Sequence, residues 1–222
     1  MIDLSKHKDF FDPSSLKSMP ITIIGVGAVG SYIAQFLAKL GIGHITIYDM
    51  DVVDDHNITN QVYTGLDIGK PKTEAIKEHM VANNDELVVE CKGRYTGEEI
   101  QGIVFLEVDS MNVRKQFAEA NEFNDNLKYV FDGRIGLDTC QLFSINWEDE
   151  QQVKDYISEV SSFKDTDVSV PVSACGLPLS VSPTVVWVAA RAVANFINMA
   201  KGEHVARFTY MNPFEGKSKT IF

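Results

Sequence analysis

Cysteine is scarce in this chain of 222 residues: there are three, at positions 91, 140 and 175, and none belongs to a Cys-x-x-Cys pair. An odd number of cysteines at such wide spacing argues against a disulfide framework and against a four-cysteine zinc site. We therefore expect the protein to work in a reducing compartment, the cytoplasm.

Long apolar runs are also missing. The most apolar stretch, residues 185–190, is interrupted by Arg191, and it falls well short of the roughly 20 residues that a membrane-spanning helix needs. The N-terminal residues are polar and do not resemble a secretory signal. We expect neither a membrane partner nor export.

Basic residues are outnumbered: 20 Lys and Arg face 31 Asp and Glu, which gives a formal net charge of -11. A strongly negative surface repels phosphate backbones, so we expect no nucleic-acid partner. A small basic pocket for a nucleotide can still exist inside an acidic shell.

What the sequence does contain is an ordinary globular composition, with 45% apolar and 23% charged residues. Short β-branched runs alternate with segments of helical period, and the first strand, helix and strand form a βαβ unit with parallel strands. The expected strands cover residues 21–24, 44–48, 87–91, 103–106, 129–131 and 140–145, and the expected helices cover residues 28–40, 71–82, 111–123 and 183–201.

These elements predict one Rossmann-like α/β domain over residues 1–222, preceded by a polar N-terminal arm at residues 1–20. The sheet should be mostly parallel and doubly wound, extended by antiparallel strands in the C-terminal half, with a closing hairpin around residues 213–216. We expect a loop at residues 161–176. The helix at residues 183–201 is too apolar for an exposed face, so we expect it in the core or in a dimer contact.

A glycine-rich turn follows the first strand and opens the first helix. Gly25, Gly27 and Gly30 form a G-x-G-x-x-G, which lets the backbone approach a phosphate at a helix N-terminus. Asp49 ends the second strand, where an acid accepts hydrogen bonds from ribose hydroxyls. Both features predict a nucleotide but do not choose between NAD and ATP. The alternative for the glycine motif is a tight turn that binds no ligand, and the alternative for Asp49 is a turn residue that ends the strand.

Three further segments narrow the choice: D-M-D-V-V-D-D-H-N-I-T-N-Q at residues 49–61, D-I-G-K-P-K at residues 67–72, and V-D-S-M-N-V-R at residues 108–114. Together with the glycine turn they resemble, in order and spacing, the motifs of the ThiF/MoeB superfamily, which includes the ubiquitin-activating enzymes. The resemblance covers residues 21–135 well and the remainder loosely.

This resemblance implies ATP-dependent adenylation of the C-terminal carboxylate of a small β-grasp protein, a sulfur carrier or ubiquitin-like modifier. It also implies a homodimer and a Mg²⁺·ATP site, with Asp51, Asn57, Asn60 and Gln61 among the nucleotide-binding residues. The missing Cys-x-x-Cys pairs of many relatives argue against zinc. An alternative role for Asn57 is that of a turn residue.

Two charged residues fit the chemistry of adenylation. Lys72, at a helix start, can bring a positive charge to the phosphates, and Asp109, after a strand, can hold Mg²⁺. The alternatives are a solvated helix charge for Lys72 and an N-cap of the next helix for Asp109.

One position departs from the family pattern. Asn60 stands where the family has an arginine, and an amide cannot offset phosphate charge as a guanidinium does. Arg94 and Arg134 are the candidates for replacing it.

Cys175 lies on the expected loop just before the long apolar helix. Some members of the superfamily carry there a reactive cysteine that receives the activated carrier, and a thiol near a helix start can gain thiolate character. The alternative is a small buried apolar residue. Cys91 and Cys140 fall inside expected strands, and we predict both in the core.

Two other functions remain open at this point. A Rossmann fold with a glycine turn and Asp49 also fits an NAD-dependent oxidoreductase, although no hydride-transfer residues are recognisable. Asn60 also fits a non-catalytic, nucleotide-binding subunit that pairs with an active partner.

Overall fold

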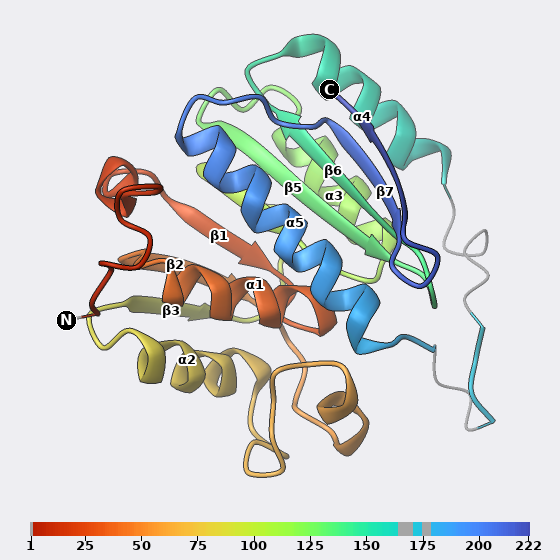
Figure 1. The fold of residues 1–222 in the computed structure, drawn as a ribbon. Coiled ribbons are helices and arrows are strands. Elements are labelled where there is room, and N and C mark those ends of the chain that lie inside the picture. Colours follow the sequence, from red (N-terminus) through yellow and green to blue (C-terminus); the bar gives the residue numbers. More distant parts are fainter. Residues whose placement is uncertain (1, 164–170, 175–178) are drawn as a thin grey trace.

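The computed structural model describes residues 2–163, 171–174 and 179–222 (Figure 1). Within these residues, eight strands form one sheet in the order β3-β2-β1-β4-β5-β6-β7-β8. The strands are β1 Ile21–Ile24, β2 His44–Tyr48, β3 Val88–Lys92, β4 Gly102–Leu106, β5 Leu127–Ile135, β6 Cys140–Asn146, β7 Phe208–Asn212 and β8 Lys217–Ile221. Pairing is parallel from β3 to β5 and antiparallel from β5 to β8, which confirms the predicted mixed sheet.

Helices cover both faces of the sheet, because successive residues of a strand point to opposite sides. On β4, Ile103 and Phe105 belong to one apolar cluster, and Val104 and Leu106 belong to the other. Figure 1 shows α1 and α5 in front of the sheet and α3 behind it. The α-helices are α1 Ala28–Lys39, α2 Lys72–Asn83, α3 Met111–Asn121, α4 Glu150–Ser162 and α5 Ser182–Ala200. Helix α1 packs against α2 and α5, and α3 packs against α4.

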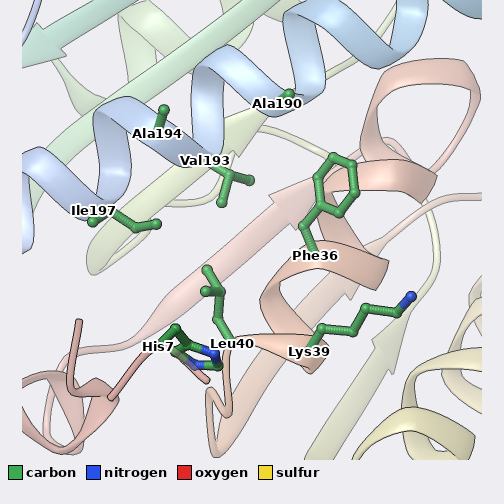
Figure 2. Close-up of a pocket in the computed structure, with 8 residues that line it drawn as sticks. All are labelled: His7, Phe36, Lys39, Leu40, Ala190, Val193, Ala194 and Ile197. Atoms are coloured by element: carbon green, nitrogen blue, oxygen red, sulfur yellow. The ribbon is translucent and has the colours of Figure 1, made fainter. Parts of the chain in front are cut away.

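Helix α5 meets the core with one face only. Val188 and Phe196 are fully buried, whereas Trp187 on the opposite face is 45% exposed. A shallow apolar groove of about 360 Å³ runs between α5 and α1, where the close-up in Figure 2 shows Leu40 and Val193 facing each other. The groove lies along the C-terminal half of α1, so it is separate from the glycine turn at the other end of that helix.

Several elements differ from the sequence-based expectation. Helix α4 forms where the sequence predicted no element. Its last two residues, 161 and 162, are helical although they fall in the expected loop at residues 161–176. The N-terminal arm is not simply polar, because Phe11 is buried and packs edge-on against Phe196 of α5. Cys140 is buried as predicted, whereas Cys91, which lies in the predicted strand, is only half-buried and packs against the margin of the core.

None of the helices in the described part of the chain has the length and apolar character that crossing a bilayer requires.

Candidate nucleotide site

The glycine turn connects β1 to α1, and two of its glycines are required by packing. Gly25 has φ +90°, and a Cβ there would lie 2.7 Å from the backbone oxygen of Glu107. A Cβ on Gly30 would overlap the backbone oxygen of Gly25. Gly27, the N-cap of α1, is different, because no described atom lies within 4 Å of its Cβ position. The space beside Gly27 is thus open among the described residues, and the first N–H groups of a helix, which have no intrahelical partner, can bind an anion there.

Asp49 ties the turn to the end of β2. Its Oδ2 accepts a hydrogen bond from the Val26 N–H and its Oδ1 accepts one from the Asp51 N–H, both at 2.8 Å. Burial raises the pKa of Asp49, while these two hydrogen bonds act in the opposite direction. Each carboxylate oxygen can accept about two hydrogen bonds, so both oxygens retain a lone pair for a ribose hydroxyl.

Lys72 and Asp51 are brought together by two short segments that run antiparallel. Val52 bridges to Pro71, and the Lys72 N–H donates to the Asp51 backbone oxygen at 2.9 Å. The Lys72 ammonium lies 2.9 Å from Asp51 Oδ2, and its side chain is 8% exposed against 53% for Asp51. The alternative of a solvated helix charge for Lys72 is therefore wrong.

Tyr63 joins the start of α2 to the glycine turn. Its buried hydroxyl lies 2.7 Å from the backbone oxygen of Val26, to which it donates, and 3.3 Å from that of Lys72. Lys72 is consequently held in a fixed relation to Gly25 and Gly27, which flank Val26.

Three predicted polar residues lie on or beside a short 3-10 helix, η2 Asp55–Thr59. Asn57 is buried, and its Oδ1 accepts from the Asp54 N–H at 2.9 Å as part of a capping box. This is the turn role considered as an alternative. Asn60 donates from Nδ2 to Ser180 Oγ, just before α5. Gln61 has a buried Oε1 without a hydrogen-bond partner among the described residues.

Asp109 follows β4, the strand beside β1, and its side chain is exposed. It does not cap α3, because Ser110 is the N-cap and its Oγ accepts from the Val113 N–H at 3.4 Å. Within the described residues no three His, Cys, Asp or Glu side chains gather as a metal site. Mg²⁺ commonly takes one or two carboxylates together with substrate phosphates, so a single exposed carboxylate at this edge fits a nucleotide-bound Mg²⁺.

The two candidates for replacing the family's arginine, Arg94 and Arg134, differ in whether their guanidinium groups are already paired. Arg134 is not available, because its guanidinium pairs with Asp132 and Glu159 at 2.7–3.0 Å. Arg94 is exposed at the carboxyl end of the sheet, beyond β3. Cys175 lies outside the described residues, and its catalytic role stays a prediction.

Glu107 is a residue that the sequence analysis did not single out. It follows β4, contacts the glycine turn through its backbone and is buried, with no well-formed hydrogen bond to either carboxyl oxygen from a described donor. A Cβ on Gly133 would overlap its Oε2. Burial, followed by the charge of Asp132, raises the pKa of Glu107 well above the ordinary 4.5. The signal in the sequence was an acid at the end of an otherwise apolar strand.

Glu107→Gln is expected to change the pH dependence of stability. Above pH 4.5 the unfolded chain releases a proton that folded Glu107 keeps, so this residue makes the free energy of unfolding fall as pH rises. The slope from one proton is at most about 1.4 kcal/mol per pH unit. The glutamine variant should lack this term, so its stability relative to the wild type should increase between pH 5 and pH 8 in chemical denaturation. Glu119→Gln, at an exposed position on α3, should keep the wild-type profile; parallel profiles for Glu107→Gln and the wild type would contradict the assignment.

Comparison with known proteins finds a family that matches nearly the whole chain. The model of the ThiF family matches residues 10–221. A tRNA threonylcarbamoyladenosine dehydratase of Bacillus subtilis is 37% identical over 86 residues, which are 38% of this chain and 34% of that protein. The molybdopterin-synthase adenylyltransferase of Escherichia coli is 29% identical over 82 residues, 36% of this chain and 33% of that protein.

Among solved structures, E. coli MccB with ATP superposes with a TM-score of 0.69 at 21% identity, over 94% of this chain and 65% of that chain. This likeness concerns the fold alone. The matched segments span about a third of the two curated relatives, and the chain covers somewhat less than two thirds of MccB.

Proposed function

Because the chain belongs to the ThiF family, we propose that it is an adenylyltransferase that activates a carboxylate with ATP. In this reaction a carboxylate oxygen bonds to the α-phosphorus of ATP, the bond to the bridging oxygen breaks, and pyrophosphate leaves. The product is an acyl-adenylate. The non-catalytic subunit and the NAD-dependent oxidoreductase are the alternatives that the experiment below separates.

The observation that carries this proposal is the position of Lys72. Its ammonium is buried and paired with Asp51, and its backbone oxygen lies 3.3 Å from the Tyr63 hydroxyl that contacts the glycine turn. A phosphate at the open start of α1 would gain N–H donors and a nearby cation, which stabilise the charge that develops as pyrophosphate departs. An NAD-dependent oxidoreductase leaves this buried cation without a role.

The remaining site residues take supporting roles. Asp49 binds the ribose, and Asp51, Asn57, Asn60 and Gln61 line the nucleotide site. Asp109 holds Mg²⁺, which neutralises phosphate charge when bound.

The carboxylate most consistent with the charge of the chain belongs to a small β-grasp protein, a sulfur carrier or ubiquitin-like modifier. The two curated relatives are named for action on a tRNA nucleoside and in molybdopterin synthesis. A net charge of -11 disfavours binding to a tRNA backbone, which makes a protein the better substrate. The proposed enzyme is a homodimer, and Cys175 accepts the acyl group as a thioester with release of AMP.

The test is exchange of labelled pyrophosphate into ATP, with Mg²⁺ and a purified β-grasp protein that ends in Gly-Gly. The same protein without its last two residues is the control substrate. Exchange that needs the intact tail supports the proposal. ATP binding without exchange favours the non-catalytic subunit. Tighter binding of NAD than of ATP would refute the adenylation proposal.

Asp109→Ala is expected to lower this exchange by about 100-fold or more, by analogy with the loss of one group that stabilises transition-state charge. Ser110→Ala is the matched control: it removes the cap of α3 and should cost about 1 kcal/mol of stability while keeping exchange. Wild-type exchange in a folded Asp109→Ala protein would remove Asp109 from the site.

A further inference from the structure

Arg94 stands at the edge of the sheet where a nucleotide would extend away from the glycine turn. The parallel register pairs Tyr48 of β2 with Lys92 of β3. Continued by two residues, this register places Met50 beside Arg94. The contact is observed, since Arg94 Nε lies 2.8 Å from the sulfur of Met50.

The residue after Arg94 fixes this segment firmly. Tyr95 is buried and its ring meets that of Tyr48 edge-on at 5.8 Å. The Tyr95 hydroxyl donates to the backbone oxygen of Glu98 at 2.7 Å. Since Tyr48 directly precedes Asp49, the backbone of Arg94 is held in place relative to the proposed ribose-binding carboxylate.

The side chain of Arg94, in contrast, is exposed and makes no ion pair within the described residues. Met50 beside it is 58% exposed. An unpaired planar cation and an exposed apolar side chain thus form one small surface next to Asp49.

The strand order decides which part of a nucleotide would reach this surface. The glycine turn follows β1, Asp49 follows β2, and Arg94 lies beyond β3. Neighbouring strands are about 4.8 Å apart, so Arg94 stands roughly two strand spacings, about 10 Å, from the turn. If the phosphates of a nucleotide lie at the end of β1 and its ribose lies at the end of β2, its base lies at the end of β3.

The other four arginines are placed elsewhere. Arg114 and Arg134 pair with Asp132. Arg191 lies on α5, and Arg207 donates to the backbone oxygen of Phe222. Of the arginines in the sequence, Arg94 alone lies at the carboxyl end of β3.

We propose that Arg94 is a purine-binding residue, whose guanidinium stacks on the face of the adenine of ATP with Met50 against it. The inference rests on the proposed use of ATP and adds a determinant of nucleotide affinity. A guanidinium is planar and weakly hydrated, so it stacks well on aromatic rings, and a thioether also makes favourable contacts with them. This assigns Arg94 to the base rather than to the phosphates that the family's missing arginine would contact.

The test compares the binding of ATP and of tripolyphosphate, which has no base, by titration calorimetry. Arg94→Ala should weaken ATP binding by about ten-fold and change tripolyphosphate binding less than about two-fold. Arg94→Lys keeps the charge but not the plane, and it should lose most of the same affinity. Lys92→Ala, an exposed residue two positions earlier, is the control and should match the wild type for both ligands.

Two results would overturn the inference: wild-type ATP affinity in Arg94→Ala, or an equal loss for ATP and tripolyphosphate, which would mark Arg94 as a phosphate ligand. Failure of the proposed function is a separate result. If the wild-type protein binds ATP through Arg94 but exchanges no pyrophosphate, the inference about Arg94 stands and the proposed adenylyltransferase activity is refuted. A wild-type protein that does not bind ATP refutes both.

Discussion

Lys72→Met is expected to slow ATP–pyrophosphate exchange by about 100- to 1,000-fold while leaving the fold intact. The Lys72 ammonium is a buried cation, and the Tyr63 hydroxyl lies between the backbone of Lys72 and that of the glycine turn. In the proposed reaction it lies beside the phosphates as negative charge moves onto the departing pyrophosphate. Methionine retains the apolar stem and removes only the charge.

The fold should survive because the partner of Lys72 can be hydrated. Asp51 is 53% exposed, so its carboxylate gains water when the ammonium is lost, and no buried charge is left without a partner. Lys70→Met is the matched control, since the Lys70 ammonium pairs with Asp67 and Glu78 instead. Equal losses of exchange in the two variants would show that Lys72 has no special role.

The largest expected effect on stability is that of Asp132→Ala, a loss of about 3–5 kcal/mol in the free energy of unfolding. Asp132 is fully buried and accepts hydrogen bonds from Arg114 Nε at 2.8 Å, from Arg134 and from the Tyr156 hydroxyl at 3.0 Å. Burial alone would raise the pKa of Asp132, but the charges of Arg114 and Arg134 hold it below its ordinary value. Alanine would leave the buried Arg114 guanidinium without its carboxylate.

Chemical denaturation with two further variants tests this explanation. Glu159→Ala should cost about 1 kcal/mol, because Glu159 is partly exposed and Arg134 still has Asp132. Adding Arg114→Met to Asp132→Ala should recover part of the loss, since the stranded charge is then gone. Additive losses in the double variant would place the cost in lost packing rather than in the unpaired guanidinium.

The parts of the fold that were predicted correctly depend on neighbours in sequence. A β-branched run, a glycine turn and a helical period define the unit from β1 to β2 without distant contacts. Helix α4 was missed even though Asp149 caps it and Val153, Tyr156 and Val160 form its buried face. That cap and that spacing can be read from the sequence alone, so this helix did not depend on tertiary contacts for its prediction.

The residues of the candidate site were chosen from the sequence and their roles stay predictions, whereas their mutual interactions could not be predicted. The pairing of Lys72 with Asp51, the capping role of Asn57 and the burial of Glu107 all depend on how separate segments meet in the sheet. The exclusion of Arg134 likewise depends on Asp132 and Glu159, the latter on another element. Periodicity carries no information about such contacts, because they are fixed by tertiary packing.

The last strand, β8, affects how the protein behaves at high concentration. All five of its residues are exposed, and it forms an outer edge of the sheet beyond β7. A free edge offers unpaired N–H and C=O groups to strands of other molecules, and charged side chains, lysine above all, oppose such pairing. Lys217 and Lys219 lie on this edge. A strand from a second molecule would meet two ammonium groups there, so the open end of the sheet is protected against edge-to-edge aggregation.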